Sequence, residues 1–427
     1  MDLTVEGKIF VNNVFEDCCI GISDGKITDI KKILKGDEHI VFKNKLILPA
    51  GIDVHVHFRD PGLTHKEDFS TGSLSALYGG ISCVFDMPNT KPQTISLKDL
   101  SDKISIASKK SYVDFGIYAG VTNDNVSSIE KLREKCNGFK IYLGSTTEAL
   151  SFDSSKLRVA LNSISLTDKP VFFHAEDEKL LLQNRNIEQN IVDHLRNRPS
   201  VCEESSIKNV LAAAEGLNIK AHICHLSSIE GLELLKDRPN NFTFGITPHH
   251  SLLSIEKIKE TQAFYKVNPP IRSSFDRETL FNSLVRGSAD ILESDHAPHN
   301  KAEKDTDFND APSGVPGVET MYPLFLYLAK KEYISFQKLN SLICRRPADL
   351  LNLQKGAIEV GKEADFIVID LKDETRIKSD DLHYKCQWTP FEDWRAIFPS
   401  TVFVRGKRLI DRGEIQVKKG FGKFVGE

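Results

Sequence analysis

The chain has 427 residues, of which 40% are hydrophobic and 27% charged, enough for one large domain and a smaller one. Its formal net charge of −4 argues against a nucleic-acid partner, since such proteins usually carry a basic surface. No run of about 18 apolar residues and no basic leader before an apolar stretch occurs, so we expect neither a membrane span nor an export signal. Eight cysteines in such a chain are expected to be reduced thiols, and a cytoplasmic enzyme is the expected class.

Short strands are predicted at both ends of the chain. Apolar, β-branched runs separated by turn residues occur at Lys8–Val11, Cys19–Ile22, Lys26–Ile30 and His39–Phe42. Similar runs near the other end are Asp365–Asp370, Ser400–Arg405 and Lys407–Ile410. Neither end can bury a sizeable core alone, so we expect residues 1–48 and 355–427 to form one small β-sandwich domain. Two unrelated flanks are the alternative.

Between these ends, apolar strands alternate with helical patterns. The strands are Leu46–Val56, Ile81–Met87, Phe115–Val121, Phe139–Leu143, Val171–Phe173, Ala221–Leu226, Phe242–Ile246 and Asp290–Leu292. The helical patterns include Lys66–Tyr78, Leu97–Lys110, Ile207–Leu217, Ile229–Lys236 and Asp276–Val285. Eight such units over residues 49–354 predict an α/β fold, a TIM-type (β/α)8 barrel; a doubly wound open sheet is the alternative.

Histidines and acidic residues recur where the predicted strands end. His55 and His57 are two residues apart on a strand, so both imidazoles point to one face. In a parallel barrel the carboxyl ends of all strands meet at the face that carries catalytic groups. Polar residues also end the later strands: Asp86–Asn89, Lys140, His174–Glu176, His222–His225, His249-His250 and Asp295–His299. A lone His-x-His pair is weak, but ligand types at five strand ends predict a metal site.

The chemistry of these side chains favours two metal ions. Imidazole nitrogens with a carboxylate suit zinc and similar divalent ions, and the set is too large for one tetrahedral site with an open position. Lys140 lies within an apolar strand, where burial near cations favours a neutral amine. Such an amine can add carbon dioxide to give a carbamate that bridges two metals. A snorkelling or ion-paired lysine is the alternative.

Several segments resemble the dihydroorotases of the amidohydrolase superfamily. They are Asp53–Asp68, Met87–Pro92, Phe139–Leu143, His222–His225, Ser294–His299, Pro316–Met321, Trp388–Phe391 and the Gly-Phe-Gly tail at Phe421. The match spans the whole chain and is closest to long-type enzymes with a lysine on the fourth strand. The resemblance implies a zinc-dependent enzyme of pyrimidine biosynthesis that reversibly closes N-carbamoyl-L-aspartate to L-dihydroorotate.

The resemblance also implies roles for individual residues. It places one zinc on His55, His57 and Asp295, the second on His174 and His225, and carboxylated Lys140 between the two. Asp295 would act as general base and then acid toward a metal-bridging hydroxide. The substrate would be bound by Arg59, Asn89, Thr146, Asn268, His299 and the backbone near Pro316 and Gly317. Arg59, with Asn89 and His299, would bind the substrate carboxylate, and Thr146 would belong to a mobile lid, Gly144–Thr147.

Two positions depart from that resemblance. The multifunctional animal relative has a third metal, held by a cysteine at the position of Cys224 and a glutamate at that of Gly245. Glycine there argues against a third metal, and Cys224 is interpreted as a buried hydrophobe. The aromatic lid residue of that relative is Thr147 here. We interpret His222, His249 and His250 as structural residues or as supports for metal ligands.

Two rival functions stay open. Hydantoinases, dihydropyrimidinases and allantoinases share the metal set and the lysine, but their substrates lack the carboxylate that Arg59, Asn89 and His299 would bind. The second rival is a non-catalytic assembly partner that has lost its ligands. We expect a homo-oligomer, such as a dimer, that acts on a small molecule and binds neither nucleic acid nor membrane. An association with aspartate transcarbamoylase is left open.

Overall fold

The computed structural model describes residues 1–146 and 150–426. Its centre is a parallel eight-stranded sheet in the order β5 to β12. The strands are β5 (Gly51–Val56), β6 (Ile81–Asp86), β7 (Asp114–Gly120), β8 (Gly138–Tyr142), β9 (Val171–His174), β10 (Ala221–Ile223), β11 (Phe242–Ile246) and β12 (Ile291–Leu292). A parallel bridge between Val56 and His296 closes the sheet, and the His57 amide donates to His296 O at 2.8 Å. The predicted barrel is therefore confirmed.

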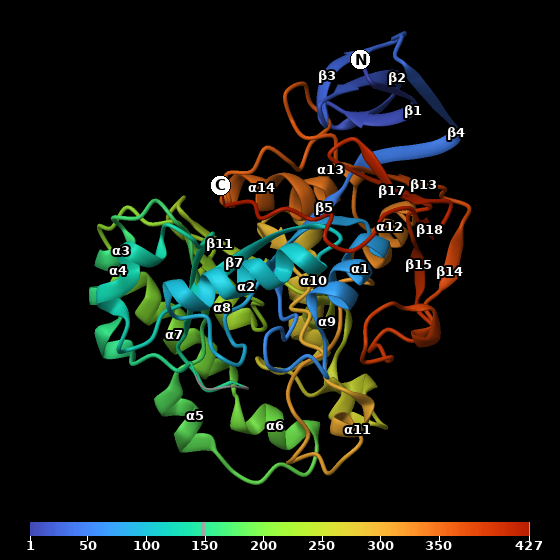
Figure 1. Ribbon diagram of the computed structural model, residues 1–427. Helices are drawn as coiled ribbons and strands as arrows, with labels where there is room; N and C mark the ends of the chain where they lie inside the picture. The colour runs from blue at the N-terminus through green and yellow to red at the C-terminus, as the bar shows by residue number, and fades with distance from the viewer. Residues whose placement is uncertain (147–149, 427) are drawn as a thin grey trace.

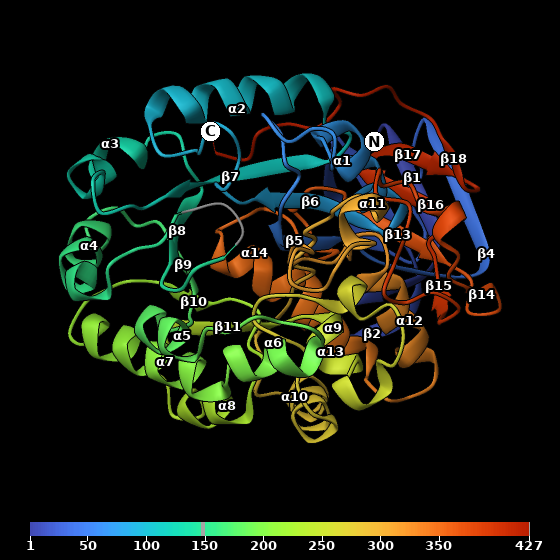
Figure 2. The same cartoon turned by 90° about the horizontal axis from the view of Figure 1, so that it is seen from below.

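Helices surround this barrel (Figure 2). They are α1 (Phe69–Tyr78), α2 (Leu97–Lys110), α3 (Ile129–Leu132), α4 (Leu157–Ile164), α5 (Glu178–Asn184), α6 (Ile191–Asn197), α7 (Ser200–Ala214), α8 (Ile229–Leu234), α9 (Pro248–Leu252), α10 (Ser274–Arg286), α11 (Lys301–Lys304), α12 (Met321–Lys330), α13 (Phe336–Asn340) and α14 (Arg346–Leu350). Local chemistry sets their ends: Ser96 and Asp99 form a capping box at the start of α2. Within the described ranges no helix has the length and apolar character to cross a membrane.

The predicted strand Leu46–Val56 is wrong as a single element. The structure divides it into β4 (Glu38–Pro49), which pairs with β13 (Phe366–Ile369), and β5, which pairs with β6. Ala50 lies between them, and its amide donates to Asp365 O at 3.1 Å. The chain leaves one sheet and enters another here. Both halves are buried, so the apolar pattern runs through the break unchanged.

The two chain ends form a second, mostly antiparallel sheet. Its order is β18-β17-β16-β13-β4-β1-β2-β3. Its other strands are β1 (Leu3–Val11), β2 (Val14–Ser23), β3 (Lys26–Lys31), β16 (Thr401–Val404), β17 (Lys407–Asp411) and β18 (Glu414–Ile415), while β14 (Glu374–Arg376) pairs with β15 (Arg395–Ile397). Val5, Ile20, Phe366 and Phe403 share one core, so the ends fold together as expected (Figure 1). The proposed boundaries of the two domains stay a prediction.

A buried lysine joins this sheet to the barrel. Lys355 Nζ lies 2.7 Å from Asp114 Oδ2, at the start of β7, and 2.7 Å from Asp365 Oδ2, just before β13. Glu363 contacts the same amine. Burial opposes the lysine charge, but Asp365 and the other acidic groups raise the pKa of Lys355 above its usual value. The cluster is thus an internal ion-pair network between the two sheets.

Replacing Lys355 by methionine is expected to destabilise the fold by about 3–5 kcal/mol, because it removes the buried cation of Asp365 and leaves Asp114 paired with Arg405. Urea unfolding of wild type and variant measures this change. Lys372→Met, at an exposed lysine, is the matched control. Equal unfolding midpoints for Lys355→Met and the control would show that the network does not stabilise the protein.

Candidate metal centre and active site

Three potential metal ligands converge where the barrel closes. His55 lies at the end of β5, His57 directly follows that strand, and Asp295 follows β12. The Nε2 atoms of His55 and His57 lie 3.2 Å apart. Asp295 Oδ1 lies 3.2 Å from His55 Nε2 and 3.1 Å from His57 Nε2. Ligand atoms about 2.05 Å from a tetrahedral zinc ion are about 3.3 Å apart, so this triangle fits one face of such a site.

A second pair of ligands lies beside the first group. His174 ends β9 and His225 follows β10; His174 Nδ1 and His225 Nε2 are 3.1 Å apart. The rings of His55 and His225 have centroids 5.3 Å apart, so the two groups share one site. The other ring nitrogen of His174, Nε2, lies 2.8 Å from Glu176 Oε2. That contact leaves Nδ1 as the nitrogen that can face a metal.

Lys140 lies on β8 beneath these ligands. Its side chain is fully buried, its Nζ atom is 3.1 Å from Cys224 Sγ and 5.0 Å from the centre of the Tyr142 ring. Burial lowers the pKa of His55 to about 4 and lowers those of His174 and His225 as well, and the Lys140 charge adds to each shift. The three imidazoles are therefore neutral at pH 7, the form that binds metal ions.

Three residues of this site have a strained backbone. Arg59, His225 and Asp295 have φ angles of 62°, 39° and 45°, in the left-handed region that residues with a side chain seldom adopt. Each follows directly or closely on a barrel strand. The chain turns there instead of continuing as a strand, which brings the three side chains to the mouth of the barrel.

The predicted anion-binding residues lie at one side of the metal ligands. Asn89 Oδ1 is 2.7 Å from His57 Nδ1, so Asn89 also orients a predicted metal ligand. His299 Nε2 lies 3.1 Å from Ser313 O and 3.4 Å from Arg59 Nη2. Burial, followed by the nearby Arg59, Lys66 and Lys304 charges, holds the pKa of His299 well below its usual value, so this imidazole is neutral.

Lys66 is a cation of this region that sequence reasoning missed. Its Nζ atom lies 3.2 Å from His299 Nδ1 and 3.0 Å from Glu303 Oε1. Because a lysine can only donate, His299 Nδ1 accepts this bond and Nε2 carries the proton. Lys66 stands in the same turn segment as Arg59, but nothing in its spacing along the chain shows that it would reach His299.

A cavity opens over the ligands and joins most of the predicted site. It is lined by His55, His57, Arg59, Asn89, Tyr142, Thr146, His174, His225, Val267, Asn268, Asp295, Ala297, Ser313 and Gly314. Thr146 and Asn268 are therefore at the cavity, whereas Lys140, His299, Pro316 and Gly317 are not among its lining residues. Ser313 and Gly314 line the wall that was expected from Pro316 and Gly317. The substrate-binding roles of all these residues stay predictions, and Thr147 lies outside the described residues.

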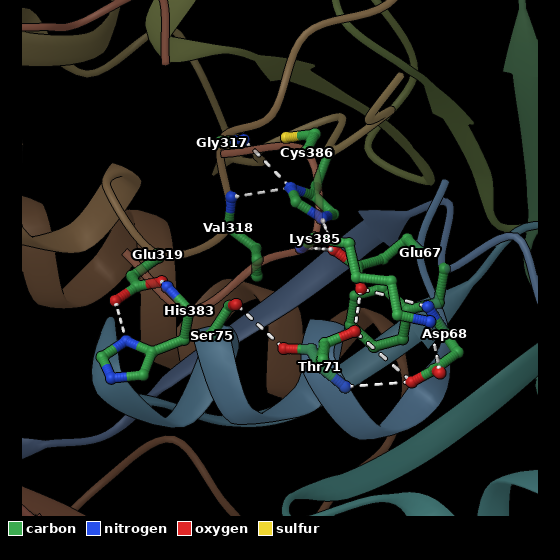
Figure 3. A network of polar contacts seen from close by, with 12 residues as sticks. Glu67, Asp68, Thr71, Ser75, Gly317, Val318, Glu319, His383, Lys385 and Cys386 are labelled. Atoms are coloured by element: carbon green, nitrogen blue, oxygen red, sulfur yellow. Dashed lines mark hydrogen bonds and ion pairs between the residues drawn. The ribbon is translucent and has the colours of Figure 1, made fainter. Parts of the chain in front are cut away.

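Gly317 instead belongs to a network of polar contacts that also contains Val318, Glu319 and His383 (Figure 3). His296 Nδ1 accepts from the Gly317 amide at 3.1 Å and from the Val318 amide at 3.4 Å. Glu319, the residue after Val318, has its Oε1 atom 2.7 Å from His383 Nδ1. The carboxyl-terminal segment thus packs against the loop that follows β12 and supports it.

Glu293 is a second residue that sequence reasoning missed. Its buried Oε2 atom lies 3.4 Å from His55 Nδ1 and 3.5 Å from His222 Nε2. A side chain added at Gly245 would collide with this carboxylate, so the residue after β12 supplies an acidic group to the space beside that glycine. Burial raises the pKa of Cys224 to about 12, which keeps a neutral thiol, as expected for a small hydrophobe. The expected absence of a third metal stays a prediction.

The closed parallel barrel and its buried His, Asp and Lys cluster define a metal-dependent hydrolase. The sequence profile of the amidohydrolase family matches residues 46–409. The chain belongs to this family and, within it, to the dihydroorotases. It is 39% identical to the dihydroorotase of Methanosarcina acetivorans, covering 98% of this chain and 94% of that one, and 38% identical to that of Thermoplasma acidophilum, covering 100% and 98%.

Solved structures with the same architecture carry other names. The L-hydantoinase (dihydropyrimidinase) of Arthrobacter aurescens superposes with a TM-score of 0.94 at 25% identity, over 99% of both chains. A D-hydantoinase superposes with a TM-score of 0.92 at 26% identity, over 100% of this chain and 99% of its own. The fold is therefore common to several cyclic amide hydrolases, and the substrate has to be argued from the site.

Proposed function

We propose that this enzyme is a dihydroorotase, which reversibly closes N-carbamoyl-L-aspartate to L-dihydroorotate. The observation that carries the proposal is the buried guanidinium of Arg59, which lines the cavity beside the metal ligands. A buried cation in a binding cavity favours an anionic ligand, and dihydroorotate has a carboxylate that hydantoin and dihydrouracil lack. The full-length relatives named dihydroorotase support the same substrate.

The proposal includes two zinc ions per chain. His55, His57 and Asp295 would hold one, and His174 and His225 the other, because both groups have the spacing of zinc ligands. Carboxylated Lys140 would bridge them from β8. When bound, such metals supply a hydroxide at neutral pH and polarise the ring carbonyl.

The residues of the chain divide the remaining work. Arg59, together with Asn89 and His299, would bind the substrate carboxylate and so place the ring over the metal ligands. Asp295, whose Oδ1 atom lies beside His55 and His57, would accept the proton of the attacking water and return it to the leaving ring nitrogen. Asn268 and the backbone of Ser313 and Gly314 line the other side of the cavity.

Hydrolysis of L-dihydroorotate, compared with hydantoin, dihydrouracil and allantoin, tests this proposal. A charge-assisted hydrogen bond contributes about 1.5–3 kcal/mol, so kcat/KM should be at least about tenfold higher for the carboxylated ring. Metal analysis of the same protein should give about two zinc ions per chain, and removal by a chelator should abolish turnover until zinc is restored. If the enzyme prefers a ring without a carboxylate, its activity is that of a hydantoinase-like enzyme and the dihydroorotase proposal is wrong.

Thr146 gives a second test of the site. Its side chain lines the cavity, and we expect it to bind the substrate as part of a lid. Thr146→Ala should lower kcat several-fold to about tenfold, the effect of losing one hydrogen bond, with metal content unchanged. Thr375→Ala, at an exposed threonine of β14, is the control. Unchanged turnover in Thr146→Ala would remove this residue from the site.

Two expectations accompany this function. We infer a cytoplasmic enzyme that forms a homodimer, and the association with aspartate transcarbamoylase stays open. Light scattering of the purified protein, alone and mixed with a transcarbamoylase, would measure both associations. A monomer at working concentration would contradict the dimer.

A further inference from the structure

One arginine at the rim of the barrel contacts a metal-ligand support and the cavity wall together. Arg198 follows α6 and precedes Pro199. Its Nε atom donates to Glu176 Oε1 at 3.1 Å, and its Nη2 atom donates to Glu176 Oε2 at 2.6 Å. Glu176 is fully buried, and the same Oε2 atom lies 2.8 Å from His174 Nε2. The guanidinium thus reaches a predicted metal ligand through one carboxylate.

The same Nη2 atom also holds the wall of the cavity. It donates to Ser145 O at 2.8 Å, and the next residue, Thr146, lines the cavity. Ser145 is held from its other side as well, since its amide donates to Glu178 Oε2 at 2.5 Å. The backbone that presents Thr146 is therefore tied to α5 and to Arg198. A single planar group joins β9 to the loop after β8.

Arg198 is itself fixed by its neighbours. Its backbone carbonyl accepts from Arg272 Nη1 at 3.1 Å, and Arg272 Nε donates to Ser227 Oγ at 3.0 Å. Ser227 Oγ also donates to Glu203 Oε1 at 2.9 Å. Only 12% of the Arg198 side chain is exposed. These contacts hold the guanidinium in one orientation, and a planar fork of several donors is needed to reach Glu176 and Ser145 together.

We propose that Arg198 is a positioning residue that couples the second metal position to the substrate-binding wall. Through Glu176 it orients His174 so that Nδ1 faces the metal, and through Ser145 it sets the backbone before Thr146. A metal-bound histidine whose other nitrogen meets a carboxylate is a better and more rigid ligand. The proposal deepens the dihydroorotase function and rests on it for the substrate. The part of the proposal that concerns metal binding does not depend on the substrate, because it involves only residues of this chain.

Three variants separate the two halves of this coupling. Glu176→Gln keeps the shape but removes the carboxylate from His174, so it should weaken retention of one of the two metals by about tenfold to a hundredfold. Arg198→Met should lower metal retention and also raise the KM for dihydroorotate, because Ser145 O loses its donor. Arg198→Lys keeps the charge without the fork, so it should recover metal retention more fully than KM.

Arg196→Gln is the matched control, since that arginine lies on α6 two residues before Arg198, is 75% exposed and pairs only with Asp193 in the interactions seen among the described residues. Metal retention is measured by dialysis against a graded chelator followed by zinc analysis, and cobalt-substituted protein reports the ligand geometry by its visible spectrum. Thermal melting shows whether Arg198→Met folds. If it does not fold, Arg198→Lys is used to test the proposal in its place.

Metal retention and KM within about twofold of the control, in folded Arg198→Met or in Arg198→Lys if only that variant folds, would overturn the proposal. A loss of stability with normal metal retention and normal KM would assign Arg198 a purely structural role and equally overturn it. If wild type fails to hydrolyse dihydroorotate, the proposed function fails, whereas the zinc and cobalt measurements still decide whether Arg198 positions His174.

Discussion

Lys140→Ala is expected to lose both bound metals and more than about a hundredfold of the activity, because residues that merely support a ligand already cost tenfold to a hundredfold. The lysine is fully buried on β8, and its Nζ atom lies 3.1 Å from Sγ of Cys224, the residue before His225. In its carboxylated form it would place an anion between the two groups of potential ligands. Without that anion, two adjacent dications repel each other, so neither should be retained.

Zinc analysis and dihydroorotate hydrolysis of Lys140→Ala measure this prediction. Short carboxylic acids such as acetate or propionate should restore part of the activity, because they can occupy the space of the missing carbamate. Lys131→Ala, at an exposed lysine of α3, is the control. It should keep the zinc content and the activity of wild type, and carboxylic acids should not alter its activity. Full metal content in Lys140→Ala would contradict the bridging role. Mass spectrometry of the intact wild-type chain should show the added carbon dioxide.

Arg59→Met is expected to lower kcat/KM for dihydroorotate by about tenfold to a hundredfold, since each loss of about 1.4 kcal/mol is a factor of ten. Arg59 lies two residues after His57, lines the cavity and is 3% exposed, so its charge is little screened by solvent. Zinc content should not change, because Arg59 is not a metal-ligand type. Arg59→Lys should recover only part of the loss, because it supplies the charge without the bidentate fork.

The same variant also discriminates between the two classes of substrate. Slow hydrolysis of hydantoin or dihydrouracil, if wild type shows any, should survive in Arg59→Met, because these rings have no carboxylate to bind. The ratio of kcat/KM values for the two rings therefore isolates the anion contact from general damage to the site. Full activity of Arg59→Met on dihydroorotate would refute the anion contact and favour the hydantoinase-like functions.

Much of the architecture was determined by the sequence alone. Apolar, β-branched runs alternate with helical patterns eight times, and each helix or strand largely follows from residues near one another in the chain. Leu97–Lys110 coincides with α2, because its capping box and its buried face are both local. The convergence of the candidate metal ligands could also be predicted, since the strand ends of a parallel barrel meet at one face whatever the details of packing.

The tertiary structure decided the features that depend on contacts between distant residues. The break at Ala50 is invisible in the sequence, because a strand buried in either sheet has the same apolar pattern. Glu293 fills the space beside Gly245 although Gly245 lies on β11 and Glu293 follows β12, and Lys66 reaches His299 across more than half of the chain. Arg198 meets Ser145 only because α6 packs against the loop after β8. Periodicity and spacing report which way a side chain points from its own element; which neighbour it meets is set by how the elements pack.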